Sequence, residues 1–70
     1  MTLREIVAKN LRQLRQAKGL SQEELAHRAG LDRNYIGNLE RMQNSPTVDT
    51  LERIASELDC DPAAFFSRSE

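Results

Sequence analysis

The stretch QEELAHRAGLDRNYIGNLER, residues 22–41, decides the fold, because its helix signals stand at fixed offsets. Ser21 precedes it as an N-cap candidate, and Glu24 three residues later completes a capping box. Gly30 supplies a left-handed stop for the first helix, and Asp32 is placed to cap a second helix almost at once. The spacing therefore predicts two short helices joined by a tight turn.

The second helix, expected over residues 33–41, divides into an apolar and a polar side on a helical wheel. One side carries the apolar residues Tyr35, Ile36, Leu39 and Met42, and the other carries Arg33, Asn34, Gly37, Asn38 and Arg41. The apolar side needs a core, whereas the polar side has donors suited to base edges and phosphates. Gly37 costs about 1 kcal/mol relative to alanine in a helix interior. Gly37 is either a tolerated loss of helix stability or a residue whose small size lets the helix sit deep in a groove.

The flanking sequence predicts three more helices. Thr2 and Glu5 form another capping box, and Thr47 and Asp61 stand as N-caps before later helices. Apolar residues recur at helical spacing in the first segment (Leu3, Ile6, Val7, Leu11, Leu14) and in the fourth (Val48, Leu51, Ile54, Ala55, Leu58). Asn10 falls inside the first stripe, as a satisfied boundary residue or as a buried group that needs a partner. We therefore expect a compact all-α domain of five helices spanning residues 1–70.

The composition restricts the function classes. Apolar residues make up 39% and charged residues 30%, as in an ordinary soluble globular domain. The absence of a membrane-length apolar run or signal-peptide core, with a single Cys60, favours a cytoplasmic protein. One histidine, one cysteine and no glycine-rich phosphate loop argue against an enzyme. We expect no metal, no cofactor, no membrane contact and no small-molecule ligand.

The charge of the chain is polarised. Residues 1–41 carry eight lysines and arginines against five acidic residues, a net +3, whereas residues 42–70 carry two against six, a net −4. The overall net charge of −1 gives no sign of a nucleic-acid partner, because phosphate binding relies on basic residues. The basic half contains the two-helix stretch. If this half faces a duplex and the acidic half faces away, the negative net charge does not oppose DNA binding.

GLSQEELAHRAGL followed by YIGNLER resembles the helix-turn-helix of the Xre (Cro/C1-type) transcriptional regulators. Ala26, Gly30 and Ile36 stand where that family keeps a small residue, a glycine and a β-branched residue. The resemblance extends from about Leu3 to Phe66, and LDRNYI with LER also resembles the controller proteins of restriction–modification systems. It implies a lambda-repressor-like, sequence-specific DNA-binding regulator with a helix-turn-helix at about 22–41.

Such a regulator would bind a pseudo-palindromic operator in double-stranded DNA as a homodimer, with the recognition helix 33–41 in the major groove. Arg33 suits guanine, and Asn34 and Asn38 suit adenine. Gln22 and Tyr35 would contact phosphates. In the loop that follows, Asn44 either contacts a phosphate or belongs to a plain polar turn. The alternative is a protein-interaction or antitoxin-like module without specific DNA binding, which the acidic pI near 5.8 favours.

The resemblance also implies structural roles. Relatives commonly pair an arginine and a glutamate at the positions of Arg15 and Glu40, as a partly buried bidentate pair or as a loose surface pair. Met42 stands where the family usually has glycine, so Asn44 could take the left-handed conformation instead. The adjacent Phe65 and Phe66 cannot both point into so small a core. One would anchor the domain and the other a partner chain, and both are candidates for the dimer interface.

Overall fold

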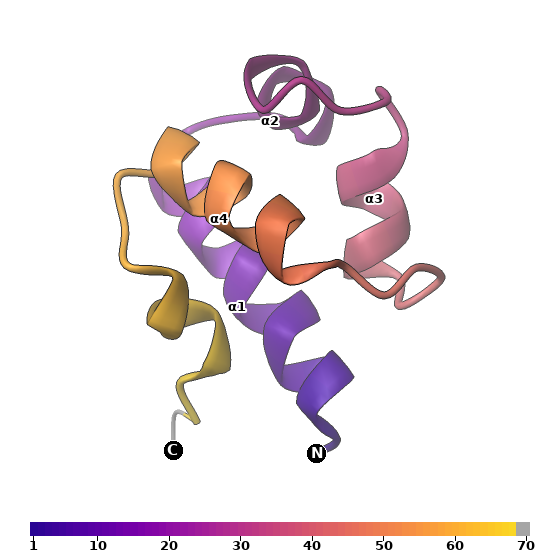
Figure 1. Ribbon diagram of the computed structural model, residues 1–70, viewed down its shortest axis with the longest axis vertical. Coiled ribbons are helices and arrows are strands. Elements are labelled where there is room, and N and C mark those ends of the chain that lie inside the picture. The colour runs from indigo at the N-terminus through magenta and orange to yellow at the C-terminus, as the bar shows by residue number, and fades with distance from the viewer. Residues whose placement is uncertain (69–70) are drawn as a thin grey trace.

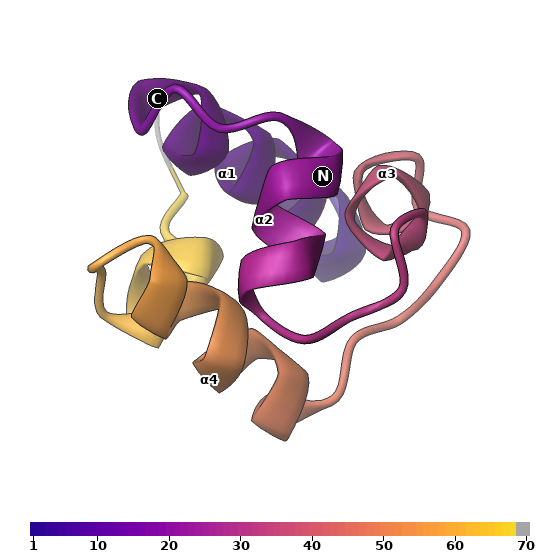
Figure 2. The ribbon, with the colours of Figure 1, turned by 90° about the horizontal axis from the view of Figure 1, so that it is seen from above.

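The structure is a computed structural model that describes residues 1–68 of the 70-residue chain. It contains four α-helices and a 3-10 helix: α1 (Leu3–Ala17), α2 (Gln22–Arg28), α3 (Tyr35–Glu40), α4 (Val48–Glu57) and η1 (Pro62–Phe66). In Figure 1, α4 crosses in front of α1, α3 stands beside them, and η1 packs against α1. Seen from above in Figure 2, α2 lies in front of α1 and between α3 and α4, both of which it contacts. The prediction of an all-α domain is confirmed, with a 3-10 helix as its fifth element.

The helix starts follow the predicted capping. Thr2 Oγ1 accepts the N–H of Glu5 at 3.2 Å, and the Glu5 carboxylate accepts the N–H of Thr2 at 2.7 Å. Ser21 and Glu24 repeat this box at 3.0 Å in both directions, and Thr47 caps α4 with its side chain. The backbone N–H bonds received by Glu5 and Glu24 lower the pKa of both carboxyls. These bonds satisfy donors that the first turn of each helix would otherwise leave free.

The core draws one large, fully buried side chain from each element: Leu11, Leu25, Ile36, Ile54 and Phe65. All five belong to one hydrophobic cluster. Phe65 therefore anchors η1 to the domain, and the expectation that Phe65 forms part of a dimer interface is wrong. Phe66 points outward and is 42% exposed.

Two residues of the predicted apolar stripes lie outside this core. Leu3 is 53% exposed and Val48 is 79% exposed. Each is the first residue of its helix, so its side chain lies at the open edge of the bundle rather than between helices. From the second turn of each helix onward, the residues of the predicted apolar stripes are buried or partly buried, as expected.

Asn10 is a buried polar group with partners. Its side chain Nδ2 donates to the carbonyl oxygens of Phe65 and Ser67, both at 2.8 Å, and the residue is 7% exposed. The two bonds satisfy carbonyls at the end of η1 and tie that end to α1.

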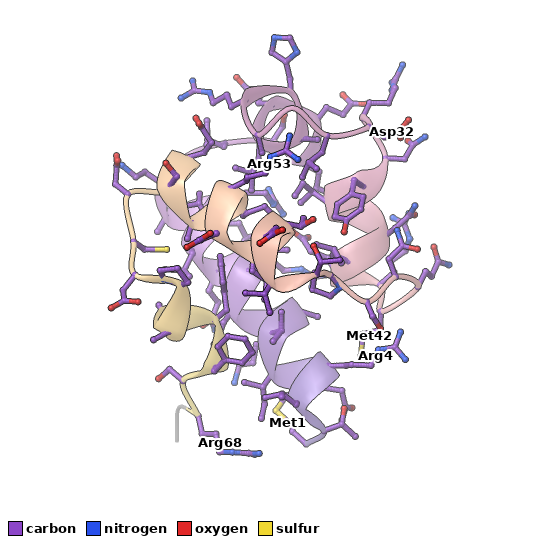
Figure 3. The ribbon with its side chains drawn as sticks, viewed as in Figure 1. Met1, Arg4, Asp32, Met42, Arg53 and Arg68 are labelled. Carbon is purple, nitrogen blue, oxygen red and sulfur yellow. The ribbon has the colours of Figure 1, made fainter. Side chains whose placement is uncertain are left out.

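Gly30 ends the α2 segment in the left-handed conformation, with φ +70°, as predicted. Arg53 reaches from α4 toward α2, as Figure 3 shows, and its Nη2 donates to the Gly30 carbonyl at 3.1 Å. A Cβ on Gly30 would lie 2.7 Å from that nitrogen. Glycine therefore suits both the backbone conformation and the close approach of the arginine.

Asn10→Asp should lower the free energy of unfolding by about 3 kcal/mol at pH 7, because it sets a buried carboxylate against two carbonyl oxygens. Asn34→Asp is the matched control, since Asn34 is exposed and this change should cost less than about 0.5 kcal/mol. Urea denaturation followed by circular dichroism measures both. Similar costs for the two variants would contradict the burial and bonding of Asn10.

Candidate nucleic-acid interface

The second helix of the predicted pair begins later than expected. It was predicted over 33–41, but α3 spans Tyr35–Glu40, and Arg33 and Asn34 lie in the turn before it. Asp32 stabilises this turn rather than capping a helix that starts at residue 33. Its Oδ1 accepts the N–H of Asn34 at 2.9 Å, and its carbonyl accepts the N–H of Tyr35 at 2.9 Å. Figure 3 labels Asp32 and Met42, which mark the two ends of the α3 segment.

Three of the six expected DNA-contacting residues, Gln22, Arg33 and Asn34, line one polar hollow. Arg33 and Asn34 are exposed, whereas Gln22, Tyr35 and Asn38 are half-buried. The hollow, of about 210 Å³, lies between α2 and α3 and is lined by Ser21, Gln22, Glu23, Arg33, Asn34, Gly37 and Arg41. Tyr35 instead packs its side chain against the core. The hollow is therefore built from the start of α2, the turn, and the outer side of α3.

Several of these side chains are held by the chain itself. Arg33 Nη2 lies 2.7 Å from Glu23 Oε2, in an ion pair whose side chains are 74% and 63% exposed. Asn38 Oδ1 accepts a hydrogen bond from Arg41 Nη2 at 2.7 Å. The Arg33–Glu23 pairing is not visible from the helical wheel, because it depends on where the turn places Arg33. Asn38 and Arg41 are three positions apart on the predicted polar side, so the wheel already places them side by side.

Gly37 lies beneath two of these side chains, which explains why it is buried. A Cβ added there would lie 2.9 Å from Gln22 Oε1 and 3.1 Å from Arg41 Nη1. Glycine thus leaves room for the Gln22 amide to cross the surface of α3. This packing role differs from both sequence interpretations of Gly37.

The Glu40 carboxylate is the point where three helices meet. Its side chain is fully buried, and Arg15 binds it through Nε to Oε2 at 2.7 Å and through Nη2 to Oε1 at 3.1 Å. Gln22 Nε2 donates to Oε1 at 2.9 Å, and Arg12 Nε lies 3.4 Å from the same oxygen. Arg15 also donates to the Leu20 carbonyl at 2.8 Å. Arg15 and Glu40 therefore form a buried bidentate pair, to which Gln22 and Arg12 are additions that sequence reasoning missed.

Opposing effects act on the pKa of Glu40. Burial raises the pKa, whereas the hydrogen bonds from Arg15 and Gln22, the charge of Arg15 and the contact with Arg12 lower it. The lowering effects prevail, and the pKa lies below its ordinary value. Glu40 is thus ionised at neutral pH, and α1, α2 and α3 are joined through one buried anion.

A family model described as helix-turn-helix matches residues 11–65, which is most of the chain. The chain belongs to the Xre (Cro/C1-type) helix-turn-helix family of transcriptional regulators. Members of this family regulate transcription and are not enzymes, as the sequence predicted. Within residues 1–68, no helix has the length and apolar character to cross a bilayer.

Named relatives include restriction–modification controllers. The control protein C.SmaI of Serratia marcescens is 40% identical over 68 residues, covering 97% of this chain and 81% of that protein. The crystal structure of the controller protein C.AhdI from Aeromonas hydrophila superposes with a TM-score of 0.86 at 43% identity, covering 90% of this chain and 96% of that one. The hypothetical transcription factor NHTF from Neisseria gives a TM-score of 0.91 at 36% identity, covering 94% and 76%.

In this helix-turn-helix regulator, α3 ends without the glycine that the resemblance leads one to expect. Met42 itself takes the left-handed conformation, with φ +60°, so the expectation for Asn44 is wrong. That conformation costs a residue with a Cβ about 1–2 kcal/mol. Compensating bonds surround it: Gln43 N–H donates to the Asn38 carbonyl at 2.8 Å, and Arg4 Nη2 donates to the Met42 carbonyl at 2.8 Å. Asn44 is half-buried in the following loop, apart from the polar hollow.

Arg15→Met should lower the free energy of unfolding by about 3–5 kcal/mol, because it leaves the Glu40 charge buried without its main partner. Arg12→Met is the matched control at the same carboxylate. Arg12 is 54% exposed and more distant, so its loss should cost less than about 1 kcal/mol. Thermal and urea denaturation compare the variants. Equal losses would show that Glu40 does not depend on the bidentate pair.

Proposed function

We propose that this protein is a sequence-specific transcriptional regulator that binds a pseudo-palindromic operator as a homodimer, with α3 and the turn before it in the major groove. The observation that carries the proposal is the two-sided character of this segment. Arg33 and Asn34 are exposed on the polar side, while Ile36 and Leu39 are buried beneath them. A rigid apolar base that presents bidentate donors is what reading of base edges requires.

The individual roles follow from the donors that remain available. Arg33 suits guanine O6 and N7, and Asn34 and Asn38 suit adenine N6 and N7. Gln22 uses one amide hydrogen for Glu40, and the second can donate to a phosphate. Tyr35 reaches a phosphate through its hydroxyl group. These contacts would place the basic half of the chain against the duplex.

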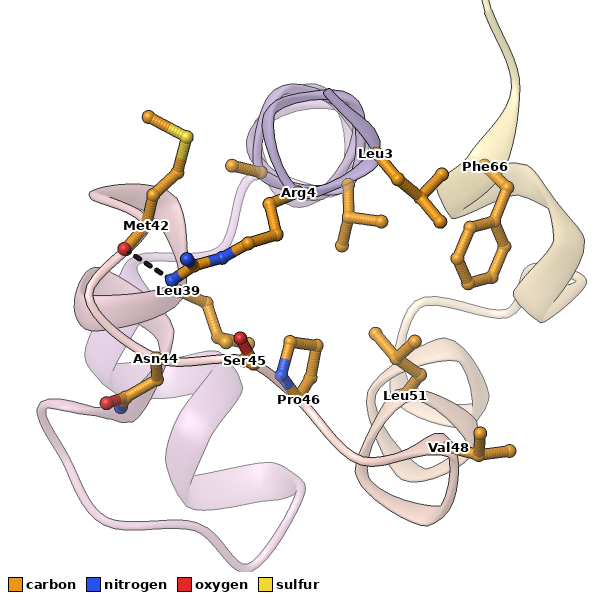
Figure 4. A pocket seen from close by; sticks show the side chains of 12 residues that line it. Leu3, Arg4, Leu39, Met42, Asn44, Ser45, Pro46, Val48, Leu51 and Phe66 are labelled. Atoms are coloured by element: carbon orange, nitrogen blue, oxygen red, sulfur yellow. Dashed lines mark hydrogen bonds between the residues drawn. The ribbon is translucent and has the colours of Figure 1, made fainter. Parts of the chain in front are cut away.

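The dimer interface lies in an apolar groove beside the end of α3. The groove, of about 280 Å³, runs between the start of α1, the loop after α3, the start of α4 and η1 (Figure 4). Its exposed apolar residues are Leu3, Met42, Val48 and Phe66. Contiguous exposed apolar surface on a small domain marks an association site. The proposed dimer presents both α3 helices to one duplex, for half-sites about 34–36 Å apart.

Similarity to C.SmaI and C.AhdI supports control of a restriction–modification system as the biological role. From the proposed DNA target we infer that the protein works in the cytoplasm. The rival function is a protein-interaction module without specific DNA binding, which the net charge of −1 favours. Selection of duplexes from a random pool at stated salt separates the two, because the rival function predicts neither enrichment nor salt-dependent binding.

Arg33→Ala should weaken binding to the selected duplex by about 1–3 kcal/mol and relax the preference at one base position in each half-site. Arg28→Ala removes the same charge from an exposed site at the end of α2 and should leave the base preference intact. Repeated selection and fluorescence anisotropy measure both effects. An affinity loss that is uniform across all sequences would make Arg33 a phosphate contact instead.

Phe66→Ser should raise the dimer dissociation constant at least tenfold, because burial of a phenylalanine side chain contributes about 1.5–3 kcal/mol. Ala63→Ser is the control, since Ala63 is exposed on the same 3-10 helix and does not line the groove. Sedimentation velocity over a dilution series gives both constants. An unchanged profile for the Phe66 variant would remove this groove from the interface.

A further inference from the structure

Arg41 is an exposed cation of the polar hollow that holds the side chain of Asn38. It is the first residue after α3. Its Nη2 donates to Asn38 Oδ1 at 2.7 Å, and its Nε lies 3.5 Å from Gln43 Oε1. None of the ion pairs within residues 1–68 includes Arg41. Its guanidinium is therefore held by neutral amide oxygens rather than drawn away by a carboxylate.

The position of this guanidinium depends on the local shape of α3. Side chains of a helix lean toward its N-terminus, so Arg41 meets Asn38 three positions earlier. The guanidinium lies over Gly37, where an added Cβ would be 3.1 Å from Nη1 and 3.5 Å from Nη2. The N–H of Gln43 donates to the Asn38 carbonyl at 2.8 Å, which keeps the loop beside the same residue. The contact between Arg41 and Asn38 is thus already formed in the protein alone.

This contact fixes the direction in which the Asn38 amide faces. A carboxamide has an oxygen that accepts and a nitrogen that donates, whereas a guanidinium has only donors. Arg41 therefore binds the oxygen of Asn38, and turning the amide by 180° would set two donors against each other. The oxygen keeps a second lone pair, and Nδ2 keeps its hydrogens. The bond to Arg41 can then stay closed while Asn38 contacts a base.

We propose that Arg41 is a positioning residue that sets the base preference of Asn38. This inference rests on the proposed function, in which Asn38 contacts adenine. Adenine presents an N6 donor beside the N7 acceptor, whereas guanine presents the acceptor O6 beside N7. With the amide held so that Oδ1 faces the base at position 6, adenine donates to it, and guanine sets one acceptor against another. An amide free to turn would offer Nδ2 to O6 and accept guanine. Arg41 also reduces the cost of ordering the Asn38 side chain on binding.

Arg41→Gln and Arg41→Lys test this role. Glutamine removes the charge and can accept as well as donate, so it no longer selects the oxygen of Asn38, whereas lysine keeps both the charge and the donor-only character. The probes are the duplex most enriched by the wild-type protein from a random pool and the same duplex with single A·T pairs changed to G·C. We expect Arg41→Gln to lower the adenine-to-guanine affinity ratio at the Asn38 position about two- to tenfold, the range for ordering one side chain. Arg41→Lys should retain the ratio.

Two further variants separate positioning from charge and from direct contact. Asn38→Ala identifies the base position concerned, because the adenine preference is lost there. Arg28→Gln removes one positive charge from an exposed residue of α2 and should leave the ratio unchanged at every position. In an Asn38→Ala background, Arg41→Gln should no longer change the ratio, because its effect acts through Asn38. A change that persists in that background would overturn the proposal and show that Arg41 reads the base itself.

A loss of affinity by Arg41→Gln that is equal on all duplexes would also overturn it and make Arg41 a phosphate contact. The same holds if Arg41→Lys loses the ratio as fully as Arg41→Gln, or if Asn38→Ala keeps every base preference. These results differ from a failure of the proposed function, which would appear in the wild-type protein as enrichment of no duplex. Anisotropy titrations at two salt concentrations, with circular dichroism to confirm folding, provide the comparison.

Discussion

The buried carboxylate of Glu40 is the constraint on which the rest of the structure depends. A helix of six residues, like α3, is not stable by itself in water. It is held from below by Ile36 and Leu39 and from the side by the bonds that Arg15 and Gln22 make to Glu40. Because those donors come from α1 and α2, the orientation of α3 is fixed relative to both. The geometry of the outer surface of α3 therefore depends on a largely buried ion pair beneath it.

Local chemistry made much of this fold predictable from the sequence. Capping boxes and a left-handed glycine involve residues within a few positions of one another, so Thr2, Ser21 and Gly30 were placed correctly. The apolar stripes also predicted the core, since one face of each helix must be buried. The errors at Leu3 and Val48 have one cause. Periodicity shows which side of a helix a residue occupies but not whether a neighbour covers its first turn.

Three further features of the structure could not be predicted from helical spacing. The turn formed by Asp32 delays the start of α3, and no spacing rule distinguishes such a turn from an N-cap. Met42 could take its left-handed conformation because Arg4, 38 positions earlier, binds its carbonyl. Phe65 rather than Phe66 faces inward because η1 is oriented by its contacts with α1 and α4, including the bond from Asn10 to the Phe65 carbonyl. The outcomes at Met42 and Phe65 depend on tertiary packing, and the turn at Asp32 depends on local hydrogen bonds; a helical wheel represents neither.

The single core shared by all five elements has a consequence for the lifetime of the protein. Each element contributes one fully buried large side chain to the same cluster, so detaching any one of them opens the interior to water. A domain organised in this way unfolds as one cooperative unit, without a stable partly folded state. Proteolysis must then wait for global opening, and its rate follows the overall stability of the chain rather than the mobility of one segment. The cellular level of such a small protein can therefore be set by its folding equilibrium.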